Sequence, residues 1–265
     1  MKRYNYHTHT YRCGHAAPLL MDEDYVKEYI KMGFDHIAFT DHMPEKVVID
    51  KRDRVRMRYD QIDEYLSSIK SLKEKYKDVI AIDTGFEVEY LPGQEDNLFE
   101  LKNMVDKLVL GQHFIYKDNF ELKHVWGNEF NDDDLKKFAN YIIEAMKLGI
   151  PDVIVHPDIF MKCRSDFGSE EEKATRSICE SAEKYNIPLE INLAQIRRFI
   201  IKKTNHIEYP SKDFWNIAKE YNIKVLYGID AHFKDQITLY DEEIKFVNKY
   251  LGDDIINNLN FIDTI

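Results

Sequence analysis

Short runs rich in β-branched and aromatic residues alternate along this chain with longer segments whose apolar residues recur at helical spacing, and the alternation repeats seven times. The expected strands are Tyr4–His9, His36–Thr40, Val79–Phe86, Leu108–His113, Asp152–His156, Pro188–Leu193 and Lys224–Ile229. The expected helices are Asp22–Met32, Tyr59–Tyr76, Asn97–Met104, Asp132–Leu148, Ser169–Tyr185, Ser211–Tyr221 and Asp241–Leu251. Because a crossover helix follows each strand, the strands should run parallel, and the predicted fold class is α/β.

A chain with this alternation forms either a closed barrel or an open doubly wound sheet, and seven repeats favour the barrel. The 265 residues suit one barrel-sized domain. No stretch rich in Pro, Gly or Ser marks a linker, so we predict a single domain over residues 1–265. The longest irregular stretches, Met43–Arg58 and Phe114–Phe130, are predicted as loops over one end of the barrel.

The charge of the chain narrows its possible partners. The chain has 48 acidic and 37 basic residues, which leaves a net charge of −11, so we expect no binding to nucleic acid or to anionic membranes. No segment approaches the roughly 18 consecutive apolar residues of a membrane span. The first residues include no apolar stretch of signal-peptide length, and the three cysteines are widely spaced, so we expect a cytoplasmic protein.

Seven of the ten histidines lie at, or just after, the carboxyl ends of the predicted strands: His7, His9, His15, His42, His113, His156 and His232. Carboxylates take the same kind of position at Glu87, Glu190 and Asp230. In a parallel barrel these strand ends converge on one pocket. Packing alone does not explain such a distribution, whereas imidazoles and carboxylates are the ligands that suit zinc, iron or manganese. We therefore predict a metal site at this end of the barrel.

Several residues near this pattern remain ambiguous or lie outside it. Glu89 shares a strand face with Glu87, and spacing alone does not choose between them. Cys13 could be a soft ligand, although a packed thiol is the simpler interpretation. The remaining histidines are interpreted as structural or solvent-facing: His36, His124 and His206.

The sequence resembles the PHP-domain phosphoesterases, and most closely their histidinol-phosphatase branch. The matching blocks are His7-Thr8-His9-Thr10 with His15, Thr40-Asp41-His42, Gly85-Phe86-Glu87, Gly111-Gln112-His113, His156-Pro157-Asp158, Glu190-Ile191-Asn192 and Gly228-Ile229-Asp230-Ala231-His232. These blocks run from the first predicted strand to the last, in the order that the family has. The resemblance implies a distorted seven-stranded (β/α) barrel, related to the TIM barrel, that holds three divalent metal ions.

The resemblance also implies which residues hold each ion, and it selects Glu87 over Glu89. The first ion would be held by His7, His9, Glu87 and Asp230. The second would be held by the bridging Glu87 with His113 and His156, and the third by His15, His42 and His232. Asp41 and Glu190 become candidates for orienting these ligands.

The implied activity is hydrolysis of a phosphate monoester by a hydroxide that bridges two of the ions, most directly with L-histidinol phosphate as the small phosphorylated substrate in histidine biosynthesis. Asp230 and His42 are the predicted catalytic residues, and either Asp230 or an ordered water would donate a proton to the leaving alkoxide. Arg197 is predicted to bind phosphate from the rim. Some members of the branch carry a second phosphate-binding arginine where this chain has Met161.

That departure at Met161 leaves other functions open. One alternative keeps the chemistry and changes the substrate to another small phosphomonoester or a nucleotide. A phosphodiesterase or exonuclease is opposed by the net charge of −11. A non-catalytic metal-binding protein is opposed by the complete ligand set.

Overall fold

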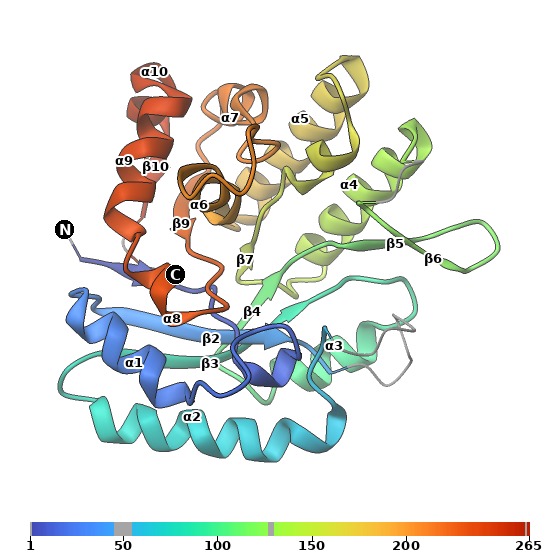
Figure 1. Cartoon of the computed structure of the whole chain (residues 1–265). Helices are drawn as coiled ribbons and strands as arrows, with labels where there is room; N and C mark the ends of the chain where they lie inside the picture. The colour runs from blue at the N-terminus through green and yellow to red at the C-terminus, as the bar shows by residue number, and fades with distance from the viewer. Residues whose placement is uncertain (1, 45–54, 127–129, 263) are drawn as a thin grey trace.

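Eight parallel strands form one curled sheet at the centre of the fold (Figure 1). The computed structural model describes residues 2–44, 55–126, 130–262 and 264–265. In spatial order the strands are β1 (Tyr4–Asn5), β2 (His36–His42), β3 (Ala81–Val88), β4 (Lys107–Leu110), β7 (Val153–Ile154), β8 (Leu189–Asn192), β9 (Lys224–Gly228) and β10 (Asn260–Phe261). The predicted parallel α/β architecture is therefore confirmed. Each of the first seven of these strands overlaps one of the seven predicted ranges, and β10 adds an unpredicted strand beside β9.

The helices lie around the outside of the curled sheet (Figure 1). They are α1 (Asp22–Lys31), α2 (Ile62–Tyr76), α3 (Glu95–Lys102), α4 (Asp132–Lys147), α5 (Ser169–Tyr185), α6 (Ala194–Ile200), α7 (Lys212–Ala218), α8 (Lys234–Ile237), α9 (Tyr240–Leu251) and α10 (Asp253–Asn258), with short 3-10 turns η1 (Tyr11–Cys13), η2 (Tyr59–Gln61) and η3 (Ile159–Cys163). Each of the seven predicted helices corresponds to one of these. No helix within the described ranges is long and apolar enough to cross a membrane.

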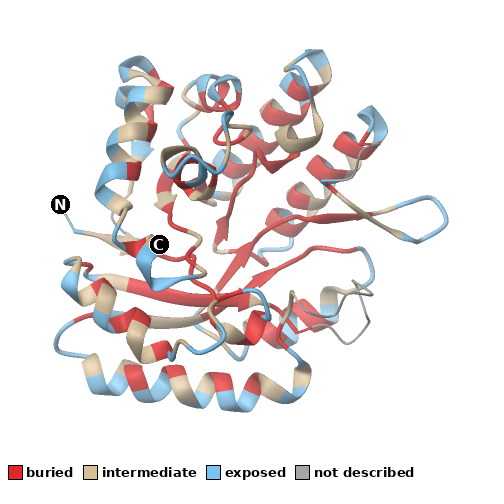
Figure 2. Cartoon of the chain, viewed as in Figure 1, coloured by how far each residue is buried: buried red, intermediate tan, exposed pale blue. Residues whose placement is uncertain are grey.

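The core lies between the strands and the inward faces of the helices (Figure 2). In α2 the buried residues Ile62, Tyr65, Ile69 and Leu72 recur at helical spacing and face the sheet. The hydroxyl of Tyr65 donates to the carbonyl oxygens of Phe39 and Gly85, both at 2.8 Å. This side chain therefore ties α2 to two neighbouring strands.

The carboxyl end of the sheet is closed by contacts between the segments that follow β1 and β9. The backbone N–H of His9 donates to the carbonyl of Ala231 at 2.8 Å, and the N–H of Ala231 donates to the carbonyl of His7 at 3.2 Å. The side chain of Asn5 accepts from the N–H of Ile229 at 2.8 Å. First and last strands of the predicted barrel thus meet where the site is built.

The structure differs from the prediction in one of the two expected loops. Residues 114–130 contain an antiparallel hairpin of β5 (Phe114–Tyr116) and β6 (Leu122–His124) that projects from the body of the fold (Figure 1). The alternation of the hairpin is only three residues long on each side, which is too short to register as a strand pattern. Much of the other expected loop, Met43–Arg58, lies outside the described residues.

Candidate metal centre

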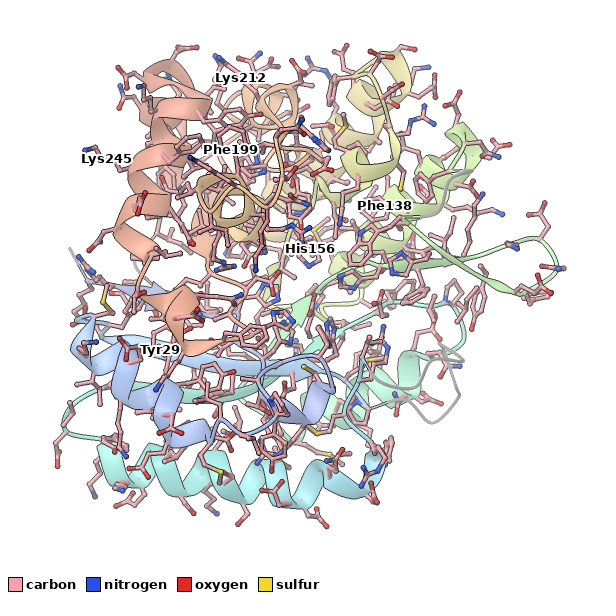
Figure 3. The ribbon with its side chains drawn as sticks, viewed as in Figure 1. Tyr29, Phe138, His156, Phe199, Lys212 and Lys245 are labelled. Atoms are coloured by element: carbon pink, nitrogen blue, oxygen red, sulfur yellow. The ribbon has the colours of Figure 1, made fainter. Side chains whose placement is uncertain are left out.

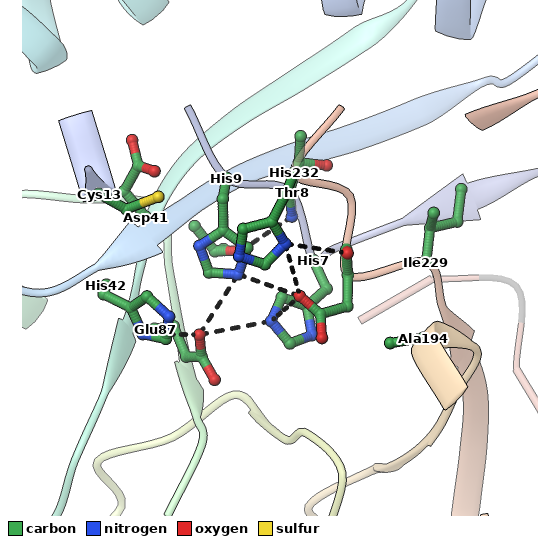
Figure 4. Close-up of polar contacts among 12 residues, drawn as sticks. His7, Thr8, His9, Cys13, Asp41, His42, Glu87, Ala194, Ile229 and His232 are labelled. Atoms are coloured by element: carbon green, nitrogen blue, oxygen red, sulfur yellow. Dashed lines mark hydrogen bonds and ion pairs between the residues drawn. The ribbon is translucent and has the colours of Figure 1, made fainter. Parts of the chain in front are cut away.

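The nine predicted metal ligands come together at the carboxyl ends of the strands. Figure 4 shows five of them: His7, His9, His42, Glu87 and His232. His7 and His9 follow β1, His42 ends β2, Glu87 lies in β3, and Asp230 and His232 follow β9. The remaining three reach the same place from segments after η1, β4 and β7: His15, His113 and His156. Parallel strand ends meet at one edge of a barrel, and this convergence is what the sequence pattern predicts.

Glu87 lies at the middle of the cluster, with a side chain that is only 1% exposed. Its Oε2 atom lies 3.0 Å from Nδ1 of His42, 3.4 Å from Nε2 of His9 and 3.5 Å from Nε2 of His7. Its Oε1 atom lies 3.0 Å from Nε2 of His156 and 3.7 Å from Nε2 of His113. One carboxylate with each oxygen facing different imidazoles is the arrangement expected of a bridging ligand.

Asp230 and His232 extend the cluster toward solvent. Oδ1 of Asp230 lies 3.3 Å from Nε2 of His9 and 3.6 Å from Nε2 of His7. Nε2 of His232 faces Nε2 of His15 at 2.7 Å. Together with His42, these two histidines place three ring nitrogens within 4.8 Å of one another. The outer histidine group therefore matches the third predicted ligand set.

Several buried polar atoms in the cluster have no hydrogen-bond partner among the described residues. They are Nε2 of His7, both ring nitrogens of His9, Nδ1 of His156 and Oε2 of Glu87. Buried polar atoms are rarely left unpaired in folded proteins, because desolvation without a partner is costly. Nitrogen and carboxylate donors that converge without partners fit divalent transition ions, so the residues present suit the predicted metals.

The electrostatics of the cluster favour its metal-binding protonation state. Burial lowers the pKa of His9, His15 and His42, and it lowers the pKa of His232 to about 3. Although burial opposes it, the surrounding imidazoles hold the pKa of Glu87 well below its usual range. Burial opposes the opposite shift at two other histidines, but nearby carboxylates outweigh it: Glu190 with Asp230 and Glu87 raises the pKa of His7, and Glu89 with Glu87 raises that of His113. The four histidines with lowered pKa values and the ionised Glu87 are therefore in the form that binds a cation, whereas His7 and His113 must lose a proton when a cation binds.

Two buried glutamates orient the histidines from behind. Oε1 of Glu190 accepts from Nδ1 of His7 at 2.9 Å, which leaves Nε2 of that ring to face the cluster. Oε1 of Glu89 accepts from Nδ1 of His113 at 2.7 Å, and Oε2 accepts from the backbone N–H of the same residue at 2.7 Å. The geometry thus separates the two neighbouring glutamates: Glu87 lies inside the cluster, and Glu89 holds one of its histidines. Sequence spacing could not make this distinction.

Asp41 acts one step further from the cluster than predicted. Its carboxylate accepts from the backbone N–H of Thr10 at 2.6 Å and from the Thr10 hydroxyl, so it holds the segment next to His9 rather than a ligand itself. Cys13 is fully buried, and its sulfur lies within 4.8 Å of ring nitrogens of His9 and His232. Burial raises the pKa of the Cys13 thiol, which favours the uncharged, packed form.

Arg197 does not lie on the rim, where it was predicted. Its side chain is buried in α6, and Nη1 and Nη2 donate to the carbonyl of Ile229 at 2.9 and 2.7 Å. Its Nε lies 3.6 Å from the buried carboxylate of Glu243 in α9. The guanidinium therefore supports the backbone that leads into Asp230. Two aromatic neighbours of the site were not predicted from the sequence. The ring centroid of Trp126 lies 5.8 Å from that of His113, and the ring centroid of Tyr209 lies 6.3 Å from that of His156.

Comparison with known proteins finds the PHP domain over residues 5–194. The probable histidinol-phosphatase of Deinococcus radiodurans is 25% identical over 234 residues, which cover 85% of this chain and 85% of that protein. The histidinol-phosphatase of Bacillus subtilis is 23% identical over 257 residues, which cover 88% of this chain and 94% of that protein. The crystal structure of histidinol phosphate phosphatase from Lactococcus lactis, complexed with zinc, L-histidinol and phosphate, has a TM-score of 0.69 at 17% identity and covers 98% of this chain and 95% of that chain.

Proposed function

This chain belongs to the PHP-domain family, and we propose that it is a metal-dependent phosphomonoesterase that hydrolyses L-histidinol phosphate to L-histidinol and inorganic phosphate. The observation that carries the proposal is the convergence of Glu87 with eight other nitrogen and carboxylate ligands, and several of these buried atoms have no hydrogen-bond partner among the described residues. Relatives that span most of this chain are histidinol-phosphatases by name. As an enzyme of histidine biosynthesis it would work in the cytoplasm.

We assign the donors to three ions, with zinc, iron and manganese as the candidate metals. The first set is His7, His9, Glu87 and Asp230, the second is Glu87, His113 and His156, and the third is His15, His42 and His232. Ions held there supply Lewis acidity, which lowers the pKa of water and neutralises the charge of the phosphoryl group. Glu190 and Glu89 keep the rings of His7 and His113 turned so that Nε2 of each faces inward.

Asp230 is the carboxylate best placed to move a proton to the leaving oxygen. Its side chain is 14% exposed, whereas the side chain of Glu87 is 1% exposed. Only Asp230 of the two can therefore contact a substrate that arrives from solvent. We also assign a catalytic role to His42, whose side chain is 13% exposed.

A second candidate keeps this chemistry with another small phosphomonoester. The burial of Arg197 favours it, because the arginine that was predicted to bind the substrate phosphate donates instead to the backbone of Ile229. The two candidates differ in selectivity. Phosphate release from a panel of phosphomonoesters, with protein restored with zinc, iron or manganese, should show a steep preference for L-histidinol phosphate, and a flat profile would favour the second candidate.

The ligand assignment is tested by Asp230→Asn. This change removes the anionic oxygen shared by two histidines, so both phosphate release and bound metal should fall. Asp235→Asn is the matched control, because it makes the same chemical change at an exposed position five residues away. An Asp230→Asn protein that keeps its metal content and its turnover would show that the assignment of this ligand is wrong.

A further inference from the structure

A cavity of about 920 Å³ lies outside the metal centre, and none of the nine proposed metal ligands lines it. Its lining includes Trp126, Lys162, Glu208 and Lys212. In Figure 3, Lys212 lies at the periphery of the fold and His156 lies near its centre. Trp126, which lines the cavity and is 46% exposed, packs edge-on against His113, with ring centroids 5.8 Å apart. Trp126 therefore lies between the cavity and His113, one of the proposed ligands.

Lys162 lines this cavity with its ammonium over the ring of Trp126. It lies in η3, the turn that follows β7 and His156, and its Nζ lies 4.0 Å from the ring centroid of Trp126 and 6.0 Å from that of Tyr209. Its ammonium makes no hydrogen bond or ion pair with any residue that the structure describes. Burial lowers the pKa of Lys162, and the carboxylate of Glu208 opposes that effect. An ammonium in this position is available to an anionic ligand group beside the metal ions.

Glu208 presents the opposite charge in the same cavity. Its Oε1 accepts from Nε2 of His206 at 2.9 Å, but its Oε2 is buried and has no partner within the described residues. Such an acceptor is costly to leave unpaired. A ligand that fills the cavity relieves this cost only if it brings a hydrogen-bond donor, and a cationic donor does so most strongly.

We propose that this cavity binds the alcohol half of the phosphomonoester, with Lys162 at the phosphate end and Glu208 selecting alcohols that carry an ammonium group. The inference rests on the proposed function, which places the phosphate at the metal ions. With the phosphate held there, Lys162 adjoins the anionic end of the substrate, and the alcohol extends outward to Glu208. A neutral alcohol of the same shape would leave Oε2 of Glu208 buried and unpaired, so the site discriminates against it.

The test compares two substrates that differ only in the amine. L-Histidinol phosphate carries the ammonium group, and 3-(imidazol-4-yl)propyl phosphate lacks it. The metal-restored wild-type enzyme should have a kcat/KM at least tenfold higher for the amine, and Glu208→Gln should reduce that ratio to within about threefold of unity. Asp213→Asn is the matched control, because it neutralises an exposed carboxylate that lines the same cavity, and it should keep the wild-type ratio.

Lys162→Met should lower the activity on both esters and leave the ratio between them unchanged. Because Lys162 adjoins the phosphate that both esters share, kcat/KM should fall about tenfold for both, mainly through KM, and the ratio between them should stay as in the wild type. Lys162→Arg should recover part of the loss. A wild-type ratio near one, or a Glu208→Gln ratio equal to that of the wild type, overturns the inference while phosphatase activity stands. No phosphate release from any ester overturns the proposed function itself.

Discussion

Gly111 is the position where the smallest change should damage the metal centre most. It follows β4, and its backbone has no positive φ, so alanine is not excluded by conformation. A methyl group added there would overlap Oε1 of Glu87, lie 2.8 Å from Cδ of that residue and lie 2.9 Å from Cε1 of His113. Gly111→Ala must therefore move the carboxylate that lies at the middle of the cluster.

The size of the effect follows from what Glu87 contacts. Its carboxylate is buried among five imidazoles, and turning it away breaks the approaches to His42 and His156, both at 3.0 Å. Changes in the outer shell of a metal site reduce affinity 10–100-fold, so displacing a bridging ligand should reduce metal affinity by about 100-fold or more, or roughly 2.7 kcal/mol. Overpacking should also reduce the free energy of unfolding of the metal-free protein by about 1–3 kcal/mol.

Metal affinity is measured by competition with a chelator, followed by measurement of the bound metal. Phosphate release then measures how far the loss of metal reduces activity. Gly168→Ala is the control, because the added methyl group meets only Oε2 of Glu171 at 3.3 Å, far from the cluster. Urea denaturation of both metal-free variants separates overpacking from metal loss. A Gly111→Ala protein that binds metal within threefold of the wild-type affinity would refute the central position given to Glu87.

Three further outcomes are expected. Glu190→Gln replaces the anionic acceptor of the His7 Nδ1 proton, and it should reduce metal affinity about 10–100-fold in chelator competition without unfolding the metal-free protein. Chelation of the wild-type enzyme should abolish phosphate release and lower the Tm by roughly 5–10 °C relative to protein held at 100 times the dissociation constant of the metal, as measured by calorimetry. Burial raises the pKa of Glu243 from 4.5 to about 7, although the nearby charge of Arg197 opposes this shift. The contribution of Glu243 to the free energy of unfolding is therefore fully present below pH 4.5, and it is lost as the pH rises through 7. From pH 4.5 to 8 the free energy of unfolding of the wild type should therefore fall by about 3 kcal/mol relative to that of Glu243→Gln in urea titrations, and parallel pH profiles would contradict this pKa.

The position of the site could be predicted from the sequence because its candidate ligands recur at the carboxyl ends of the predicted strands, and these ends meet in a parallel barrel. Residues as distant as His7 and Asp230 meet because both follow parallel strands, and the carboxyl ends of such strands share one edge. The same logic could not choose between Glu87, which lies in β3, and Glu89, which follows the strand, because residues two apart on an extended segment project to the same side. That choice depends on how far along the strand the histidines of other strands reach, and only the three-dimensional register supplies it.

The surroundings of the site were less predictable because they depend on contacts that leave no periodic signal. The hairpin of β5 and β6 carries Trp126 just beyond its second strand and brings it against His113. Tyr209 reaches His156 from an irregular segment between α6 and α7. Neither aromatic residue lies in a strand or a helix. The apolar spacings of about two residues for strands and about 3.6 residues for helices therefore could not identify either of them.

The role of Arg197 depends on contacts with residues that are distant in the sequence. Its sequence position after β8 is equally compatible with the rim and with the interior, since both lie within reach of a long side chain. Glu243, which is 0% exposed in α9, places a buried carboxyl group 3.6 Å from Nε of Arg197, and the carbonyl of Ile229 accepts from both terminal nitrogens. Once the guanidinium is held there, it fixes the backbone immediately before Asp230 and is unavailable to a substrate phosphate. Under the function that we propose, the charge of the phosphate would be met by the metal ions and by a different cation. Lys162, which makes no ion pair with any described residue and lies over Trp126, is the cation to which we assign that role.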